Sequence, residues 1–371
     1  MPPIGAQNPI QAIVAERGKM PFREFMDLAL YHPEHGYYAS GRAAVGRKGD
    51  FFTNVSVGRV YGELLAGQFV EMWERLGQPA NFTIVEQGAN DGAFAEDVLG
   101  WCREHAPGFY ANVRYTIVEP FNVLRSRQEQ RLAEHADKVT WYPDLDDLPR
   151  FTGVHFSNEL VDAFPVHLVR WRVDGWQELY VTGDLEWKEV PLQPRWMRDR
   201  LTDVPQIDGY TTELNVDAFQ WAETVAGVIE RGWVLTVDYG MPRDRYYAPE
   251  RHTGTLQCYA AHTKGLDPLA NPGHCDLTTH VEFTSLAQAF LTAEMTLAGY
   301  TDQHHFLTGL AARAFAQRAP TPQEARGLKT LLHPEMLGTS FQVLAMSRNV
   351  PAEALAGFQF ARDGYRGLGV G

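Results

Sequence analysis

The stretch Glu86–Gly92, which reads EQGANDG, has the residue types of a ligand-binding turn. It follows the apolar, β-branched run Thr83–Val85 and precedes a segment with apolar residues at helical spacing. Open α/β sheets bind nucleotide-like ligands at the carboxyl ends of their strands. The binding segment there consists, in order, of a strand, an acidic residue, a glycine-rich turn and a helix. The residues predicted to contact this ligand are Glu86, Gly88, Asn90 and Gly92.

The composition of this turn narrows the choice of ligand class. A dinucleotide fingerprint needs GxGxxG and a triphosphate loop needs GK[ST], and neither pattern occurs here. Asn90 stands where a middle glycine is expected, and asparagine tolerates a left-handed backbone. Such a turn suits a ligand without phosphates, and S-adenosylmethionine is the obvious candidate. The alternative is an ordinary strand–turn–helix, because glycine-rich turns are common after strands.

A second polar segment, Ser157–Val166, follows the apolar strand candidate Val154–Phe156. Polar groups at the carboxyl end of a central strand point into the ligand crevice of an α/β sheet. The segment contains Asn158, Glu159 and Asp162, and two close carboxylates can anchor a guanidinium or ammonium group. The alternative is a turn in which Asn and Asp bind their own backbone.

Two further acids could contact a nucleoside. Glu119 ends the predicted strand Arg114–Val118, where a carboxylate can accept hydrogen bonds from both ribose hydroxyls. Asp144 follows the strand candidate Val139–Tyr142 and could face an adenine amino group. Either residue could instead be a solvated surface acid.

Further elements are needed to position these residues. Apolar spacing predicts helices, and apolar or alternating runs predict strands. The predicted helices are Pro21–Tyr31, Val60–Leu76, Val216–Glu230 with Gly232 as its stop, and Leu286–Leu297 ended by Gly299. The remaining strand candidates are Trp233–Val237, which leads into Asp238, and Ser340–Met346. His167–Trp187 alternates like an inserted hairpin, and the tail from Phe358 is predicted to fray.

Composition sets outer limits on function. The chain has 371 residues and a net charge of −13, which argues against a general nucleic-acid binder. We expect no membrane span, because no window approaches 18 uninterrupted apolar residues, and no signal peptide at the start. The cysteines Cys102, Cys258 and Cys275 form no CxxC pair, so we expect neither a disulfide framework nor a structural metal site. A reducing cytoplasm is the predicted location.

Several motifs occur in one order along the chain. They are GDFFT at 49–53, YGELLA at 61–66, EQGANDG at 86–92, SNELVDAFPV at 157–166, VDYG at 237–240, GTLQCYAAH at 254–262 and PGHCDLTTHVEF at 272–283. This series resembles the MidA-like family of S-adenosylmethionine-dependent methyltransferases, whose mitochondrial members act as complex I assembly factors. The resemblance covers roughly Pro21 to Ser347 and implies a class I, Rossmann-like methyltransferase fold. The mitochondrial members methylate arginine in a protein subunit.

The resemblance also implies roles for individual residues. Asp50, Phe51 and Thr53 would form a lid loop over the cofactor, and Asn158 would also contact it. Glu159 would be the main anchor of an arginine acceptor, helped by Asp162, with Asp238 or Asp276 nearby in the crevice. The implied partner is a protein substrate, and a homodimer is compatible with the sequence.

The resemblance and the sequence pattern together divide the chain into five parts. They are a helical layer with the lid loop (1–80), the cofactor-binding half of the sheet (81–165), an inserted β-rich region (166–215), the rest of the sheet with a long loop at 240–282 (216–350), and a tail (351–371).

The sequence departs from the family pattern E-x-G-P/A-G-R-G at two positions of the turn. Asn90 replaces the middle glycine, and Asp91 replaces an arginine near the cofactor carboxylate. The segment Leu337–Leu344 also lacks the family's Glu and Lys. A divergent member need not share the family's substrate.

Three other functions stay open at this point. A non-catalytic assembly factor could keep the fold with a decayed cofactor site. A small-molecule methyltransferase could use an aromatic pocket built from Trp171, Trp176 and Tyr180. A zinc enzyme would use His262, His274, Cys275 and His280, although their spacing fits no standard finger.

Overall fold

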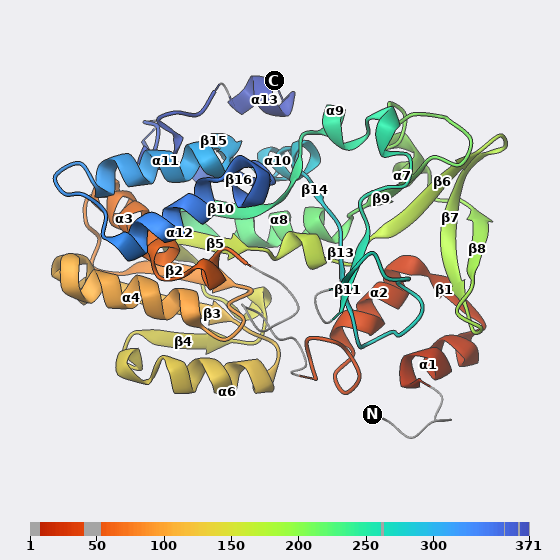
Figure 1. The fold of residues 1–371 in the computed structure, drawn as a ribbon, viewed down its shortest axis with the longest axis horizontal. Helices are drawn as coiled ribbons and strands as arrows, with labels where there is room; N and C mark the ends of the chain where they lie inside the picture. The colour runs from red at the N-terminus through yellow and green to blue at the C-terminus, as the bar shows by residue number, and fades with distance from the viewer. Residues whose placement is uncertain (1–7, 41–52, 261–262, 352, 363, 371) are drawn as a thin grey trace.

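The central element of the computed structural model is a mostly parallel sheet (Figure 1). The structure describes residues 8–40, 53–260, 263–351, 353–362 and 364–370. The sheet order is β15-β16-β10-β5-β2-β3-β4, and β14 pairs with β10. The strands are β2 (Phe82–Gln87), β3 (Val113–Val118), β4 (Val139–Tyr142), β5 (Phe151–Asn158), β10 (Ile229–Met241), β14 (Val281–Glu282), β15 (Thr296–Asp302) and β16 (Phe341–Arg348). Strands β10, β5, β2, β3 and β4 run parallel, and β16 runs antiparallel to both neighbours.

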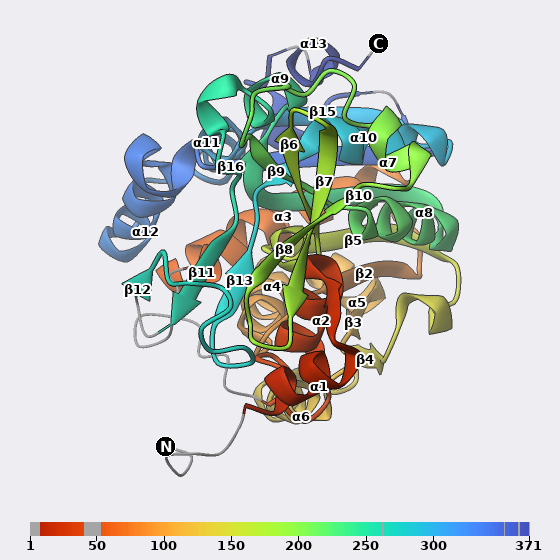
Figure 2. The ribbon, with the colours of Figure 1, turned by 90° about the vertical axis from the view of Figure 1, so that its right-hand side faces the viewer.

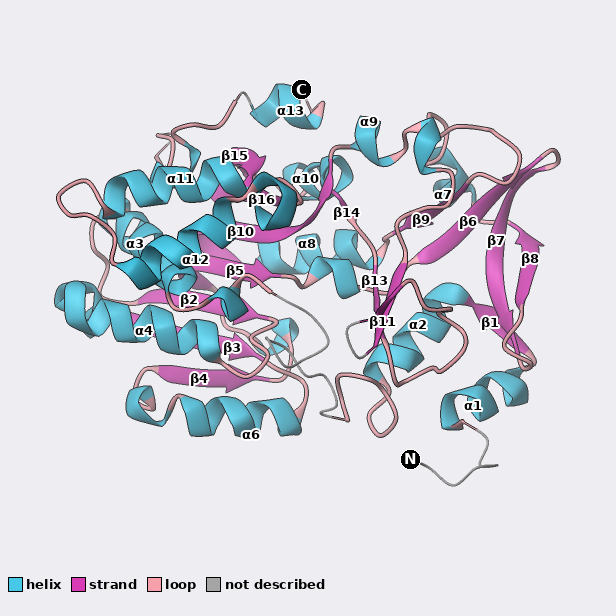
Figure 3. Ribbon diagram, viewed as in Figure 1, coloured by secondary structure: helices cyan, strands magenta, loops and turns pink. Residues whose placement is uncertain are grey.

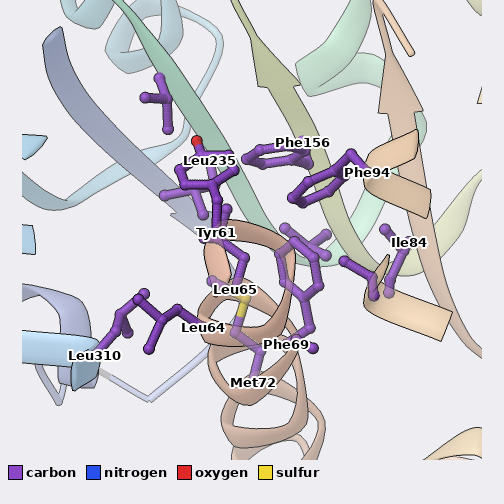
Figure 4. Packing of buried hydrophobic residues seen from close by; sticks show 14 of the residues in the cluster. Tyr61, Leu64, Leu65, Phe69, Met72, Ile84, Phe94, Phe156, Leu235 and Leu310 are labelled. Atoms are coloured by element: carbon purple, nitrogen blue, oxygen red, sulfur yellow. The ribbon is translucent and has the colours of Figure 1, made fainter. Parts of the chain in front are cut away.

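Helices cover both faces of this sheet (Figure 3). Successive side chains of the inner strands point to opposite faces, and both faces are apolar. Ile84 and Leu235 face one layer, and their neighbours Val85 and Val234 face the other. The first layer contains α3 (Val60–Arg75), α4 (Ala93–His105), α5 (Pro107–Asn112), α11 (Gln303–Ala314) and α12 (Pro322–Leu332). The second contains α8 (Asp217–Val228) and α10 (Phe283–Thr292). Side chains of α3 pack on β2, α4, β5 and β10 in the first layer (Figure 4).

A second sheet lies beside the main one and faces the viewer in Figure 2. Its order is β1-β7-β6-β9, with β8 paired to β7. These strands are β1 (Lys19–Pro21), β6 (His167–Arg172), β7 (Gly175–Thr182), β8 (Trp187–Pro191) and β9 (Thr211–Leu214). Helices α1 (Pro9–Arg17) and α2 (Phe22–Tyr31) share a buried cluster with β6 and β7. The first 80 residues therefore serve both sheets: α1, β1 and α2 pack with the inserted hairpin, and α3 packs on the main sheet.

A small third sheet lies within the long loop at 240–282. It consists of β11 (Gln257–Ala260), β12 (Thr263–Lys264) and β13 (Asp276–Thr278), in the order β12-β11-β13. The remaining helices are α6 (Asn122–Arg131), α7 (Arg195–Asp199), α9 (Arg243–Tyr246) and α13 (Gly364–Leu368). No helix among the described residues is long and apolar enough to cross a membrane.

Three local predictions are wrong. Gly232 does not stop a helix but lies inside β10, where a Cβ atom would approach the Gly153 oxygen of β5 to 1.8 Å. Gly299 lies inside β15, and a Cβ atom there would meet the ring of Phe358. The tail is not frayed in its described part, because Leu368 and Val370 are buried in the second layer.

Candidate active site

A cavity of about 1190 Å³ lies at the carboxyl ends of β2, β3, β5 and β10. Its wall includes the glycine-rich turn, the strand-end acids Glu86 and Glu119, and the segment after β5. Tyr31 and Tyr38 complete the wall from the N-terminal segment. Ligand pockets for small molecules usually measure roughly 300–1,000 Å³, so this cavity has room for more than a cofactor.

The glycine-rich turn has the backbone that its sequence predicts. Gly88, Asn90 and Gly92 have φ angles of 84°, 47° and 84°, so the left-handed conformation at Asn90 is confirmed. A Cβ atom at Gly88 would lie 3.3 Å from the side chain of Leu160, which closes the other side of the turn. The Asn90 carbonyl oxygen accepts a hydrogen bond from Nε2 of Gln128 at 2.8 Å. The turn is therefore a tight cradle that a larger side chain would fill.

Asp91 lines the cavity and makes an ion pair. Its Oδ2 lies 2.7 Å from the Arg131 guanidinium, and its Oδ1 accepts the backbone N–H of Ala93 at 3.2 Å. Arg131 also binds Glu96. The acid that replaces the family's arginine thus accepts the first N–H of α4, and Arg131 of α6 neutralises its charge.

Glu86 and Glu119, the acids at the strand ends, are buried, and each carboxyl group can accept further hydrogen bonds. Oε1 of Glu119 accepts the Phe121 N–H at 3.0 Å, and Oε2 accepts Nε2 of Gln128 at 2.9 Å. Oε2 of Glu86 accepts the Tyr115 hydroxyl at 2.7 Å. Burial raises the pKa of Glu86 and of Glu119 to about 7. A carboxylate has about four acceptor positions, so each can still bind a hydroxyl hydrogen of a ligand.

Glu159 projects from a strained turn directly after β5. Its φ angle is 53°, which is uncommon outside glycine. Oε1 accepts Nδ2 of Asn158 at 2.9 Å and the backbone N–H of Asn54 at 3.2 Å. Oδ1 of Asn158 accepts the Tyr61 hydroxyl at 2.7 Å. Burial in the cavity wall raises the pKa of Glu159 to about 8.

Asn54 supports the site from behind the wall and was not among the predicted site residues. It is fully buried, and its Nδ2 donates to Oδ1 of Asn158 at 3.1 Å. Its Oδ1 accepts Nε2 of Gln303, a buried residue of α11, at 2.9 Å. The carboxylate of Glu159 is therefore held through a network that reaches the helical layer of the main sheet.

Asp162 and Asp276 are buried in the same wall as Glu159. Oδ1 of Asp276 accepts the Tyr38 hydroxyl at 2.8 Å, and the Asp162 carbonyl oxygen accepts the Thr279 N–H at 2.8 Å. Burial, with the neighbouring charges of Asp238 and Glu159, raises the pKa of Asp162 well above its usual value. Three carboxyl groups in one wall form a site for a positively charged group.

Asp238, predicted to lie in the crevice beside the acceptor, is behind the cavity wall and does not line the cavity. Its Oδ2 accepts the backbone N–H groups of Leu160, Val161 and Asp162 at 3.2, 2.9 and 3.3 Å. Its Oδ1 accepts the Tyr239 N–H at 2.8 Å. The side chain therefore fixes the backbone turn that carries Glu159 and Asp162.

The remaining predicted residues divide into three groups. Thr53 lines the cavity, and its N–H donates to the Ser56 hydroxyl at 2.9 Å. Asp50 and Phe51 fall outside the described residues, so the lid stays a prediction. Asp144 is exposed and accepts the Asp146 N–H at 3.0 Å. It does not line the cavity in the described part of the chain, and its adenine contact also stays a prediction.

Sequence reasoning missed the aromatic part of the wall. The Tyr31 hydroxyl donates to the Ala163 carbonyl oxygen at 2.8 Å, and the Tyr31 ring lies parallel to Phe121 with centroids 6.4 Å apart. Tyr31 and Tyr38 stack with centroids 5.6 Å apart. In the sequence, Tyr31 is only the end of a predicted helix and Tyr38 only part of the pair 37–38. Neither could be assigned to a site without knowing where α2 packs.

The described residues offer no support for two alternative sites. Trp171 and Trp176 contact each other edge-on within the second sheet, 5.3 Å between centroids, and neither lines the cavity. No group of three or more His, Cys, Asp or Glu side chains among the described residues could hold a metal ion. His262 of the zinc hypothesis falls outside those residues.

Comparison with known proteins agrees with this geometry. A family model for S-adenosyl-L-methionine-dependent methyltransferases matches residues 64–301. The chain belongs to this family. It is similar to a methyl transferase superfamily member from Burkholderia thailandensis crystallised with S-adenosyl-homocysteine, with 29% identity, a TM-score of 0.86 and 96% of each chain covered. The predicted class I fold, methyltransferase activity and S-adenosylmethionine cofactor are confirmed.

Curated relatives extend the comparison over nearly the whole chain. The mitochondrial protein arginine methyltransferase NDUFAF7 homolog of Drosophila melanogaster is 28% identical, covering 93% of this chain and 85% of its own. The human protein arginine methyltransferase NDUFAF7, also mitochondrial, is 23% identical, covering 96% of this chain and 88% of its own. The resemblance read from the motifs is confirmed.

The predicted cytoplasmic location is wrong on this comparison. The relatives from Drosophila melanogaster, Homo sapiens and Xenopus tropicalis are all named mitochondrial proteins. Unpaired cysteines distinguish reducing from oxidising surroundings, but they do not tell one reducing compartment from another.

The raised pKa values predict how stability changes with pH. In the folded chain the pKa is about 7 for Glu86 and Glu119 and about 8 for Glu159, whereas the ordinary pKa of a glutamate is 4.5. These side chains therefore keep their protons to a higher pH in the folded chain than in the unfolded chain. Between these limits unfolding releases protons, so rising pH favours the unfolded chain. We expect the Tm to fall as the pH rises from about 5 to about 8. Thermal melts over this range check the sign, and Glu159→Gln should flatten the slope; a rising Tm would contradict the expectation.

Proposed function

We propose that this methyltransferase transfers the methyl group to the guanidinium of an arginine side chain in a protein. The observation that carries the proposal is the position of Glu159, Asp162 and Asp276 in one wall of a cavity that also contains the glycine-rich turn. A site for a cation thus adjoins a site for the cofactor. The relatives named protein arginine methyltransferases support the same acceptor.

The cofactor half of the cavity fits S-adenosylmethionine. Gly88, Asn90 and Gly92 would hold its amino-acid part against the backbone, with Thr53 and Asn158 on the opposite side. Glu119 would accept hydrogen bonds from the ribose hydroxyls, and Glu86 would support the same end. When bound, the cofactor supplies an electrophilic methyl group on a sulfonium.

The acceptor half positions a nucleophile. Glu159, held at Oε1 by Asn158 and Asn54, keeps Oε2 available to bind one edge of a guanidinium. Asp162 would bind a second edge, so that one nitrogen points at the methyl group. Methyl transfer is an in-line displacement, and correct positioning of the two reactants supplies much of its acceleration. The tyrosine wall would restrict the water that enters the cavity.

The cofactor site is tested by calorimetric titration with S-adenosylhomocysteine. Gly88→Arg should abolish binding, because its Cβ would lie 3.3 Å from Leu160, the long side chain would fill the cradle, and φ is left-handed. Glu119→Ala should weaken binding by about 10-fold or more through lost charge-assisted hydrogen bonds to ribose. Glu129→Ala, an exposed acid on α6, is the matched control. If Glu119→Ala bound S-adenosylhomocysteine with unchanged affinity, Glu119 would not bind the ribose.

The acceptor is tested by incubating the protein with labelled S-adenosylmethionine and polypeptides that contain either arginine or lysine. Mass spectrometry then locates the methyl group. We expect methylarginine and no methyllysine, because two carboxylates match the forked guanidinium better than a point charge. Methylation of lysine, or of a free small molecule alone, would overturn the proposal.

A further inference from the structure

Two arginines line the cavity without a partner. Arg245 is exposed on α9, and Arg251 is half-buried at the end of the short turn 249–251. Neither guanidinium makes a hydrogen bond or an ion pair with another described residue. Their neighbour Arg243, in contrast, binds Asp203 and Glu282. Among the described residues, Arg245 and Arg251 are the only lysine or arginine side chains in the cavity wall.

The sheet order places these arginines away from the cofactor side. The glycine-rich turn follows β2 and Glu119 follows β3, whereas α9 and the turn 249–251 follow β10. In the order β10-β5-β2-β3, β5 separates β10 from the cofactor strands, and β5 carries Glu159 at its end. Figure 1 shows α9 beyond the end of β10, on the side of the second sheet. Both arginines therefore adjoin the acceptor half of the cavity.

The other ionisable side chains of the described cavity wall are mainly acidic: Glu86, Asp91, Glu119, Glu159, Asp162 and Asp276. Those with a raised pKa become negative once a bound cation or a higher pH removes their proton. The whole chain also has a net charge of −13, so two unpaired cations at the cavity rim are not part of a general basic surface. A rim of this kind repels a ligand that carries positive charge alone and favours one that carries a negative group beside it.

We propose that Arg245 and Arg251 bind a carboxylate next to the methyl acceptor, so that the preferred substrate is a polypeptide with Asp or Glu flanking the acceptor arginine. The inference rests on the proposed function and adds the sequence context of its substrate. Arginine is suited to this role because its fork binds a carboxylate through two hydrogen bonds. The cavity volume of about 1190 Å³ leaves space for such a flanking residue.

The test uses three peptides of equal length with one central arginine, flanked on both sides by Asp, by Asn or by Lys. Affinity is measured by calorimetry with the protein saturated with S-adenosylhomocysteine, and kcat/KM is measured with S-adenosylmethionine. We expect the Asp peptide to bind about fivefold more tightly than the Asn peptide, as for a partly exposed ion pair, and the Lys peptide to bind least. The difference should shrink as salt is added.

Charge reversal provides the decisive comparison. Arg245→Glu with Arg251→Glu should invert the order, so that the Lys peptide binds best. Arg114→Glu with Arg150→Glu makes the same change of charge at exposed positions near the amino ends of β3 and β5, and should keep the order of the parent protein.

The outcomes separate the two proposals. Equal binding and methylation of all three peptides would overturn the flanking-acid inference and leave arginine methylation standing. Failure of every peptide to bind or become methylated would overturn both. Loss of S-adenosylhomocysteine binding in the Arg245/Arg251 variant would assign these arginines to the cofactor carboxylate and would also overturn the inference.

Discussion

Glu159→Gln should lower kcat by about 100-fold or more while S-adenosylhomocysteine binds as before. The substitution keeps the side-chain oxygen that accepts the hydrogen bonds from Asn158 and Asn54, so the geometry of the wall is preserved. It removes the negative charge that would hold the acceptor guanidinium and spread the positive charge that develops on it. Turnover is measured with an arginine-containing polypeptide, and cofactor affinity is measured separately by calorimetry.

The control for this experiment is Glu230→Gln, which removes the same charge at the opposite end of the molecule. Glu230 is exposed near the amino end of β10, whereas the cavity lies at the carboxyl end. It should therefore keep full activity. A Glu159→Gln variant with unchanged kcat would show that the carboxylate does not anchor the acceptor, and a variant that lost cofactor binding would place Glu159 in the other half of the cavity.

The pH profile of the parent protein gives an independent test of the same residue. Because burial raises the pKa of Glu159 to about 8, acceptor binding at lower pH must first displace a proton. Activity should rise with pH through this region, and Glu159→Gln should lose that rise. The two measurements together separate a charge effect from damage to the fold.

The parts of the fold that follow from short-range pattern were predictable. Strands β2 to β5 are apolar runs of the kind that a parallel sheet buries, and β4 was predicted with its observed ends. Gly232 and Gly299 were misread as helix stops because their role depends on a neighbouring strand or ring that local sequence does not show. A glycine that ends a helix and a glycine that admits a close backbone neighbour look alike in sequence.

The candidate site shows the same division between local and distant information. Glu86, Glu119 and Glu159 could be placed at the cavity from sequence because each stands at the end of a predicted strand. Tyr31 and Tyr38 were missed because they reach the cavity only after α2 packs against the second sheet. Arg245 and Arg251 were missed because an unpaired arginine cannot be told from a paired one until its surroundings are known.

Asp238 lies behind the cavity wall rather than in it, and its hydrogen bonds lead to a large expected effect on stability. Its carboxylate accepts four backbone N–H groups, three of which belong to residues 160–162. Asp238→Ala would leave these buried donors without acceptors, at a cost of about 1–3 kcal/mol for each unsatisfied group before the chain relaxes. We expect the free energy of unfolding to fall by about 3–5 kcal/mol in total, as for other broken buried networks of charge.

Urea denaturation of Asp238→Ala measures this loss, and Asp137→Ala, at an exposed position, is the control with an expected change below about 0.5 kcal/mol. A stable Asp238→Ala protein that lost only turnover would instead place Asp238 at the acceptor, as the sequence first indicated. The expected result makes Asp238 a positioning residue, because the turn it braces is the one that directs Glu159 and Asp162 toward the cavity. A loosened turn should therefore raise the KM for the polypeptide. It should also weaken S-adenosylhomocysteine binding, but by less, because Leu160 of this turn packs on the Gly88 cradle while the cradle itself follows β2.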